Sequence, residues 1–352
     1  MKTTIERRAR QVASKLWSGL GLVVLSARDR DEILRTAPQL RHLFRLREEV
    51  ARARGRLPHG AIDYLRFDNP RLLELKARYA GHPASEHVQW RSEDIKRGVD
   101  LPFFRGDNLY VFQSRRYSAF TVYASAAYAS MIDQLRLLDR LDEDDYFGAE
   151  LFEFHTKPVS RDLIDSIIEI NFLERYLGLS RLASFNVMDI GAGYGRLAHR
   201  MTATFPQLDT YYCIDAVPES TFISEYYCGF RQLNSARVVA LDELNRDCTG
   251  PIELAINVHS FQECKASVVA WWLGLLHNRR IPWLFVVTGS NLGLTGYEGN
   301  GRRKDLGGVI QDAGYRLFVH EHKFEAASPL RELGVYPADY YLFRGDWQSD
   351  RA

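Results

Sequence analysis

Three glycines at alternate positions follow an apolar run in the segment NVMDIGAGYGRLAHR, residues 186–200. Asp189 lies near the end of that run, and the loop after it contains Gly191, Ala192, Gly193 and Gly195. Glycine adopts positive φ and has no side chain, so this loop lets the backbone approach a ligand closely. A strand, a glycine loop and a helix in this order predict a cradle for a nucleotide-like ligand. A tight turn that serves only helix packing is the alternative.

The spacing of the loop separates two classes of ligand. A dinucleotide fingerprint places its third glycine where this chain has Arg196, so the pattern disfavours an NAD-dependent oxidoreductase. Asp215 ends the next apolar segment, where a carboxylate accepts hydrogen bonds from both hydroxyls of a ribose. That carboxylate serves NAD and S-adenosylmethionine equally.

A candidate general base follows a later apolar segment, in the string NVHSFQE. A hydroxyl ionises far above neutral pH. An enzyme that transfers a group to a hydroxyl oxygen therefore commonly needs a general base within hydrogen-bond reach of the hydroxyl. We predict that His259 is this base. If a helix begins near Ser260, Glu263 orients or polarises the imidazole. The alternative is a structural histidine at a strand end.

Two further segments are candidates for contact with cofactor or acceptor. Arg161 and Asp162 begin a predicted helix, and we place Arg161 with the acceptor and Asp162 with the catalytic groups; Asp162 could equally be a first-turn carboxylate favoured by the helix dipole. The Gly- and Asn-rich segment 288–305 predicts a mobile loop over a substrate pocket, where Tyr297 stacks on the substrate and Arg302 binds its hydroxyls. An ordinary connecting loop is the alternative for that segment.

The elements that position these residues follow from hydrophobic periodicity. Apolar spacing and Ser160 predict a helix that ends near Gly178. Strands then alternate with helices, which predicts a parallel sheet covered on both faces. The strands are FNVMDI, YYCID, ARVVAL, IELAINV and PWLFVVT, and the helices include GRLAHRMTATF and CKASVVAWWLGLLHN. Two last strands, YRLFVHEHKF and DYYLFRGDW, predict an antiparallel edge hairpin, whereas the first 150 or so residues are mainly helical in pattern.

Composition excludes several classes of protein. The 352 residues have a net charge of +1, although residues 1–60 carry fourteen basic against six acidic residues. These charges interleave with apolar residues as on solvated helices, so we expect no nucleic-acid partner. No run approaches the roughly 20 apolar residues that span a bilayer. The four cysteines show no zinc pattern, so we assign no metal ligands and expect a cytoplasmic protein, although a Mg²⁺ site assembled from distant carboxylates stays open.

The motifs together resemble those of class I S-adenosylmethionine-dependent methyltransferases, over about residues 160–346. The resemblance rests on VMDIGAGYGRLA, YYCIDAVPES, VVALDEL and IELAINVHSFQE, in that order. It implies a Rossmann-like seven-stranded sheet. It also implies a cofactor site in which Asp189 and the glycines border the methionine part, Asp215 binds the ribose, Ala216 flanks the adenine, and Leu241 and Asp242 lie near the adenine edge. Asn257 is grouped with this site, and because Val, His and Ser follow it, the motif of nucleic-acid amino-methyltransferases is absent.

A narrower resemblance points to the acceptor. The strings SRDLIDSIIEI, DIGAGYGRLAHRM and YYCIDAVPESTF are similar to the family of sugar O-methyltransferases found in bacterial glycoside and polysaccharide gene clusters. This implies methyl transfer to a sugar hydroxyl by a core at 159–352, with a helical region at 1–158 that caps the acceptor pocket or forms a homodimer interface. Another small-molecule O-methyltransferase, such as one acting on a polyketide, and a non-catalytic cofactor-binding protein are the alternatives.

Overall fold

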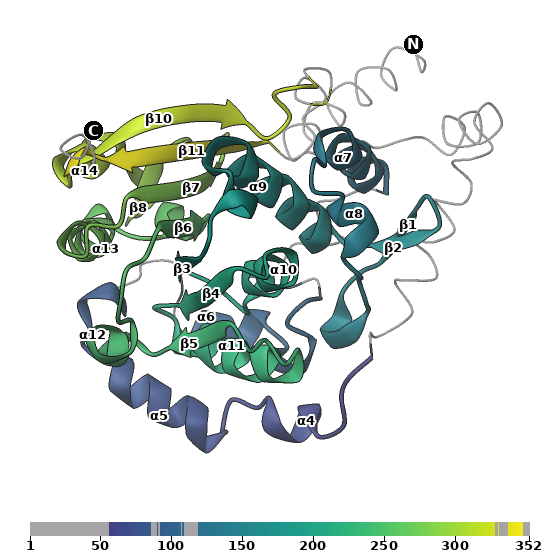
Figure 1. Cartoon of the computed structure of the whole chain (residues 1–352). Coiled ribbons are helices and arrows are strands. Elements are labelled where there is room, and N and C mark those ends of the chain that lie inside the picture. The colour runs from purple at the N-terminus through teal and green to yellow at the C-terminus, as the bar shows by residue number, and fades with distance from the viewer. Residues whose placement is uncertain are drawn as a thin grey trace, which may run out of the picture.

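A seven-stranded sheet forms the centre of the protein (Figure 1). The computed structural model describes residues 56–85, 90, 92–106, 108, 119–327, 330 and 337–347. The strand order is β10–β11–β7–β6–β3–β4–β5. The bounds are β3 Phe185–Ile190, β4 Leu208–Ile214, β5 Ala236–Val239, β6 Leu254–Val258, β7 Trp283–Gly289, β10 Tyr315–His322 and β11 Ala338–Gly345. Pairs from β5 to β7 are parallel, and β11 pairs antiparallel with both β7 and β10, which confirms the predicted fold class and edge hairpin.

The central strands bury both faces because their residues alternate between two apolar layers. Val187, Ile256 and Phe285 pack in the layer that holds α9 (Arg161–Leu177) and α10 (Arg196–Thr204). Met188, Ala255 and Leu284 pack in the layer that holds α13 (Ala266–Asn278). The other helices after β3 are α11 Pro218–Phe230, α12 Leu244–Asp247 and α14 Gly307–Asp312. Helices therefore cover the two sides of the sheet, as the alternation of strands and helices predicts.

The helix α9 has the ends that the sequence predicts. The Ser160 Oγ accepts the N–H of Leu163 at 3.0 Å and caps the first turn. Gly178, at φ 59°, ends the helix, and its N–H donates to the carbonyl of Glu174. The helix is buried over most of its length, so its polar side chains face other protein groups rather than water.

The described residues before α9 are mainly helical and include one small hairpin. Their elements are α4 Ala61–Tyr64, α5 Pro70–Tyr79, η1 Pro83–Ser85, α6 Ser92–Gly98, η2 Leu101–Phe103, α7 Ala119–Ile132, α8 Leu137–Arg140, η3 Tyr146–Gly148, β1 Phe152–Phe154 and β2 Lys157–Val159. The helical pattern of 119–141 is interrupted, because Arg136 adopts φ 56° and Asp133 accepts the N–H of Leu138 at 2.8 Å. The basic segment at 1–55 lies outside the described residues. The division at 158/159 stays a prediction.

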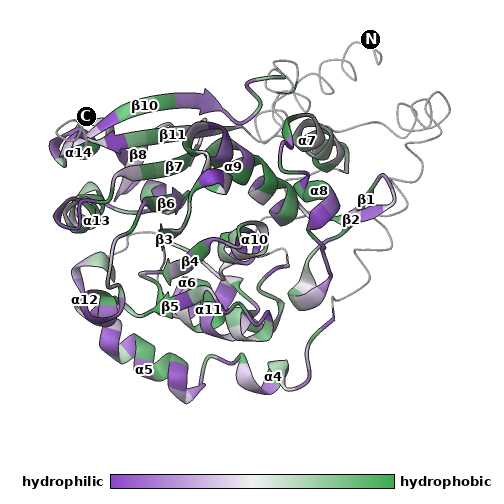
Figure 2. Cartoon of the chain, in the orientation of Figure 1, coloured by the Kyte–Doolittle hydropathy of each residue, from purple (hydrophilic) through white to green (hydrophobic). Residues whose placement is uncertain are grey.

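Amphipathic α5 attaches this region to the rest of the protein. Figure 2 shows that α5 alternates between hydrophobic and hydrophilic residues, whereas α7 is mostly hydrophobic. The buried Tyr79 hydroxyl lies 2.9 Å from Thr221 Oγ1 of α11, and Arg71 donates to both carboxylate oxygens of Glu225. The following η1 packs against α13 in the same layer, and His82, just before η1, contacts Trp271 edge to face. Segments far apart in sequence therefore pack along the edge that ends in β5 (Figure 1).

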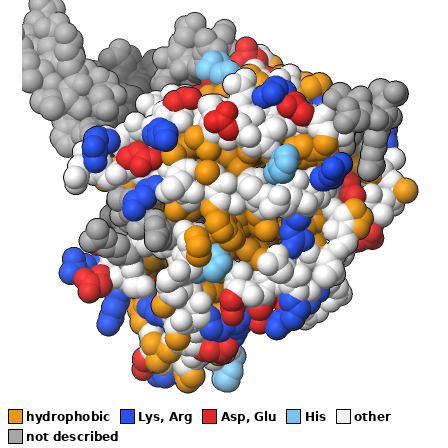
Figure 3. Space-filling view, turned by 90° about the vertical axis from the view of Figure 1, so that its left-hand side faces the viewer, with side chains coloured by type: hydrophobic (Ala, Val, Ile, Leu, Met, Phe, Trp, Pro, Cys, Tyr) orange, Lys and Arg blue, Asp and Glu red, His pale blue; other side chains and the backbone are white. Residues whose placement is uncertain are grey.

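The surface near α13 carries a hydrophobic area. Figure 3 shows apolar side chains gathered in the middle of this face, with charged side chains around them. Trp271 and Leu275 of α13 and Leu294 are among the partly buried residues that pack on the core here. Within the described residues, no helix combines the length and apolar character needed to cross a membrane.

Candidate functional site

The glycine loop lies at the carboxyl end of β3, as predicted. The N–H groups of Gly191 and Ala192 both donate to the Ile214 carbonyl of β4, at 2.8 and 3.1 Å. Gly191 has φ 79°, and a Cβ there would lie 2.2 Å from the Ser260 Oγ. Gly193 has φ 57°, and a Cβ there would meet open space. The loop is therefore held against β6 on one side and is open on the other.

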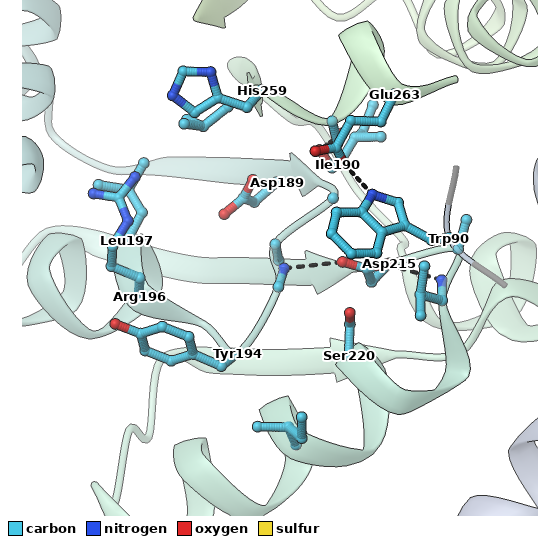
Figure 4. Close-up of a pocket in the computed structure, with 18 of the residues that line it drawn as sticks. Trp90, Asp189, Ile190, Tyr194, Arg196, Leu197, Asp215, Ser220, His259 and Glu263 are labelled. Carbon is cyan, nitrogen blue, oxygen red and sulfur yellow. Dashed lines mark hydrogen bonds between the residues drawn. The ribbon is translucent and has the colours of Figure 1, made fainter. Parts of the chain in front are cut away.

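The open side faces a cavity at the carboxyl ends of β3, β4 and β6 (Figure 4). Ten of the residues predicted for the site line it. They are Arg161, Asp162, Asp189, Gly191, Ala192, Gly193, Asp215, Ala216, His259 and Glu263. The structure thus brings together side chains from α9, β3, β4 and the turn after β6.

Asp215 is held in place by backbone donors. Its Oδ2 accepts the N–H of Gly193 at 2.9 Å, and its Oδ1 accepts the N–H of Val217 at 2.8 Å. Burial raises the pKa of Asp215 to about 6, although these backbone hydrogen bonds lower it. The group is therefore mostly ionised at neutral pH. A carboxylate has about four acceptor positions, so each oxygen can still accept a hydrogen bond from a ligand.

His259 occupies an unusual backbone position beside the cavity. It has φ 65°, immediately before the short 3₁₀ helix η6 (Ser260–Glu263), and its N–H donates to the Val287 carbonyl at 2.9 Å. Burial, with the Arg161 charge next, lowers the pKa of His259 to about 4. The imidazole is therefore neutral at physiological pH, the form that accepts a proton.

The prediction that Glu263 pairs with His259 is wrong. Glu263 accepts a hydrogen bond from the indole N–H of Trp90, and Figure 4 shows the Glu263 carboxylate at this indole and the His259 ring apart from it. The reason is local geometry: His259 precedes the helix with left-handed φ, and a 3₁₀ helix has about three residues per turn, so positions four apart do not share a face. Burial raises the pKa of Glu263 to about 7.

The first turn of α9 forms the wall on the other side of the loop. Asp162 accepts hydrogen bonds from the Tyr194 hydroxyl and from Arg161 Nη2, the latter at 3.3 Å. Arg196 donates to the Ser166 Oγ at 2.8 Å and pairs with Glu169 at 2.9 Å. The residue that fills the third-glycine position of a dinucleotide fingerprint thus anchors the loop to α9.

Six residues predicted for the site do not line the cavity: Gly195, Leu241, Asp242, Asn257, Tyr297 and Arg302. Gly195 faces α11, where a Cβ would lie 3.3 Å from Ser224 Oγ. The N–H of Leu241 donates to the Tyr79 hydroxyl at 3.3 Å, beneath α5. The cofactor roles of Gly195, Leu241, Asp242 and Asn257 and the acceptor roles of Tyr297 and Arg302 stay predictions, which the lining of this cavity does not support.

Two of these residues are held by specific partners. Asp242 forms an ion pair with Arg78 of α5 at 2.7 Å, and this hydrogen bond is the main reason why the pKa of Asp242 is lowered. Asn257 is fully buried; its Nδ2 donates to the Ile190 carbonyl at 2.8 Å, and its Oδ1 accepts the N–H of Phe261 at 3.0 Å. Asn257 therefore positions the carboxyl ends of β3 and β6.

The segment 288–305 forms a hairpin rather than the predicted loop. Its strands are β8 (Thr295–Gly299) and β9 (Arg302–Asp305). The N–H of Tyr297 donates to the Cys264 carbonyl at 2.9 Å, and Arg303 Nη2 donates to the Gln262 carbonyl at 2.6 Å. The hairpin therefore packs against the turn after β6. Backbone pairing satisfies the polar groups that the Gly- and Asn-rich composition suggested would be solvated.

Several residues that the motifs did not identify also line the cavity. They include Trp90, Phe104, Tyr194, Arg196, Ser220 and Trp272. Three of these residues, Tyr194, Arg196 and Ser220, lie inside or next to the glycine and Asp215 motifs. Their place in the sequence could therefore have identified them as residues of the site. Trp90 and Phe104 lie in an irregular stretch before residue 108, and nothing in their own neighbourhood points to the cavity. Long-range packing alone places them there.

Comparisons with known proteins add little to this geometry. No protein-family model and no curated protein matches the sequence. Solved structures similar to this chain include an S-adenosylmethionine-dependent methyltransferase from Clostridium acetobutylicum (11% identity, 51% of this chain and 89% of that chain, TM-score 0.37). A SAM-dependent methyltransferase from Aquifex aeolicus (17%, 49% and 88%, TM-score 0.33) and the [4+2]-cyclase SpnF (14%, 63% and 96%, TM-score 0.39) are also similar. These likenesses are too weak to support a conclusion about activity.

Replacement of Gly191 by alanine should destabilise the protein. The new Cβ would lie 2.2 Å from Ser260 Oγ at a backbone φ of 79°, so both a steric clash and strain of about 1–2 kcal/mol are expected. Gly274→Ala is the matched control, since a Cβ there meets nothing within 4 Å and alanine favours a helix. Urea unfolding should give a lower free energy of unfolding for Gly191→Ala and an equal or higher one for Gly274→Ala. Equal stability of the two variants would contradict the close contact.

Asp189→Asn should change how stability depends on pH. Burial raises the pKa of Asp189 to about 7, so between about pH 4 and 7 the folded state binds a proton that the unfolded state, with a pKa of about 3.9, does not. The wild-type free energy of unfolding therefore contains a contribution that falls as pH rises through this window. Asn cannot titrate, so urea unfolding should favour the variant relative to wild type increasingly from pH 4 to 7.5. Asp209→Asn, exposed on β4, is the control, and parallel pH profiles for Asp189→Asn and wild type would refute the buried neutral carboxyl.

Proposed function

We propose that the chain is an S-adenosylmethionine-dependent O-methyltransferase whose cofactor lies in the cavity at the glycine loop. The observation that carries this proposal is the placement of Asp215, whose carboxylate is fixed by the N–H groups of Gly193 and Val217 and borders the same cavity as the loop. The glycine loop and the Asp215 carboxylate thus border the same space, which suits a ligand that contains a ribose. The dinucleotide alternative is disfavoured because Arg196 is tied to Ser166 and Glu169.

The residues of the cavity fit the parts of this cofactor. Open space over Gly193 admits a ligand against the backbone, and Asp215 retains acceptor positions for ribose hydroxyls. Ala216 and Val217 offer small apolar contacts for the adenine of the cofactor. The Arg161 guanidinium borders the cavity, where it can pair with the cofactor's carboxylate. When bound, the cofactor supplies an electrophilic methyl group. The chain supplies orientation, which accounts for much of the rate of a displacement reaction.

His259 is the group we assign to proton removal from the acceptor hydroxyl. Its ring borders the cavity, and its lowered pKa keeps it neutral, so that it can take the proton as the hydroxyl oxygen attacks. Glu263 is not its partner; we assign Glu263, with Trp90, to the wall of the cavity next to Asp215. Asp162 fixes the Tyr194 hydroxyl and Arg161, so its role in catalysis is one of positioning.

The acceptor we propose is a hydroxyl of a sugar, glycoside or oligosaccharide. The resemblance of SRDLIDSIIEI and its companion motifs to sugar O-methyltransferases supports this choice. The polar wall formed by Arg161, Asp162 and His259 offers donors and acceptors for neighbouring hydroxyls. A polyketide or another small molecule with a hydroxyl would meet the same base.

Asp215→Asn should weaken binding of S-adenosylhomocysteine by roughly 10- to 100-fold, because hydrogen bonds to a charged group contribute about 1.5–3 kcal/mol. Asp242→Asn is the matched control: its carboxylate pairs with Arg78 outside the cavity, so its affinity should equal that of wild type. Isothermal titration calorimetry measures both, with NAD as a second ligand. Binding of NAD but not S-adenosylhomocysteine, or equal effects of the two substitutions, would overturn the cofactor assignment.

His259→Asn should lose about 10²- to 10⁴-fold in kcat while keeping affinity for S-adenosylhomocysteine, since only the proton acceptor is removed. Asn is chosen because it tolerates the positive φ of this position. The measurement is mass spectrometry of mono- and oligosaccharides and of a polyketide panel incubated with isotopically labelled cofactor. Methylation of polyketides alone would replace the sugar assignment, full turnover by the variant would remove His259 as the base, and cofactor binding without any product would favour a non-catalytic protein.

A further inference from the structure

We propose that the chain binds a divalent first-row transition-metal ion, with Zn²⁺ as the best fit, at the edge of the sheet through His320, His322 and Asp339. These residues belong to the antiparallel pair β10–β11. They do not line the cavity of the proposed cofactor site. The inference therefore stands apart from the methyltransferase assignment.

The register of the two strands brings the three side chains together. His322 lies opposite Asp339, and His320 lies opposite Tyr341. Residues two apart in a strand point to the same face, so both imidazoles and the carboxylate share one face of the pair. One ligand atom from each of the three residues lies within 4.8 Å of the others.

The distance between His320 and Asp339 matches the size of a tetrahedral zinc site, and His322 lies closer still to the same carboxylate oxygen. The His320 Nε2 lies 3.4 Å from the Asp339 Oδ1, and the His322 Nδ1 contacts the same oxygen. Two ligands that are each about 2.0–2.1 Å from a tetrahedral Zn²⁺ lie about 3.3 Å apart. Small side-chain rotations therefore suffice to separate the nitrogens around an ion.

Asp339 shows why a cation fits here. Its residue is only 4% exposed, and although both imidazole nitrogens lie near its Oδ1, this oxygen accepts no hydrogen bond from the part of the chain that the structure describes. A buried carboxylate oxygen is costly unless a charge or donors compensate it. An ion held jointly with His320 and His322 supplies that charge without requiring the imidazoles to be protonated.

The three candidate ligands are also held in place by their neighbours, and their atom types favour Zn²⁺. The His320 ring stacks on Tyr341, with centroids 4.3 Å apart and planes 6° apart, and Asp339 lies on β11, which is paired on both sides. Two imidazole nitrogens and one carboxylate oxygen suit Zn²⁺, whereas Mg²⁺ and Ca²⁺ prefer oxygen ligands. Three protein ligands leave a fourth position of a tetrahedral ion to water or another oxygen ligand.

The cluster lies at the same end of the sheet as the cavity. His322 ends β10, and Ala338, the first residue of β11, lies opposite Gly289, the last residue of β7. Since β7 is parallel to β6 and β3, this is the edge of the sheet at which the cavity also lies. The cluster thus lies on the two strands that are second and third from β6, on the side of β6 away from β4 and Asp215.

The test is a titration of the metal-stripped full chain with Zn²⁺ against a chromophoric chelator. Wild type should bind one equivalent, and His320→Gln and Asp339→Asn should bind it at least about 100-fold more weakly. His59→Gln is the matched control, because His59 is exposed and far from β10 in sequence, and it should bind as wild type does. Co²⁺ substitution should give the visible absorption of a tetrahedral site in wild type and in His59→Gln only.

Folding and cofactor binding are measured on the same samples. Thermal unfolding should show a Zn²⁺-dependent rise in Tm for wild type that His320→Gln loses. His320 is partly exposed, so its variant decides the question even if Asp339→Asn does not fold. S-adenosylhomocysteine affinity should be equal in wild type and His320→Gln, which separates this site from the proposed function. Absence of stoichiometric Zn²⁺ binding in wild type, or undiminished binding in His320→Gln, would overturn the proposal.

Discussion

The buried amide of Asn257 is the contact on which the site depends. It joins the last residue of β3 to the turn after β6, since it donates to the Ile190 carbonyl and accepts from Phe261. It also donates to Ser260 Oγ, the atom that leaves no room for a side chain at Gly191. A single side chain thus sets the spacing between the glycine loop and the turn that carries His259. Because the amide is fully buried, each of these hydrogen bonds is made in a low-dielectric interior, where leaving one unmade is costly.

Buried charges on α9 extend this arrangement to the wall of the cavity. Arg196 pairs with Glu169, and Lys323, just after β10, pairs with Asp165. Burial raises the pKa of Glu169 to about 7, whereas the charges of Lys323 and Arg161 keep the pKa of Asp165 near 2 in spite of burial. Burial is the main cause of the lowered pKa of His259, and the charges of Arg161, Arg196 and Lys323 lower it further. The charge state of the candidate base is therefore a property of several elements together.

The N-terminal region contributes to the site through packing rather than through a motif. The helix α5 lies on α11, Ser85 donates to the Ala216 carbonyl at 3.2 Å, and the Trp90 indole binds Glu263. These contacts span more than a hundred residues of sequence, and no local pattern around Trp90 encodes them. The same packing brings Arg78 of α5 to Asp242, with which it forms an ion pair.

Much of the architecture could be predicted from local pattern. Short-range preferences of single residues determine the apolar strands, the Ser160 cap, the helix end at Gly178 and the loop at Gly191. These preferences act wherever the chain folds, so β3 and α9 lie where the pattern predicts them. The identity of side-chain partners could not be predicted this way. Glu263 binds Trp90 rather than His259, and His320, His322 and Asp339 meet across two strands, because such contacts depend on register and on long-range packing, for which a single sequence carries no local signal.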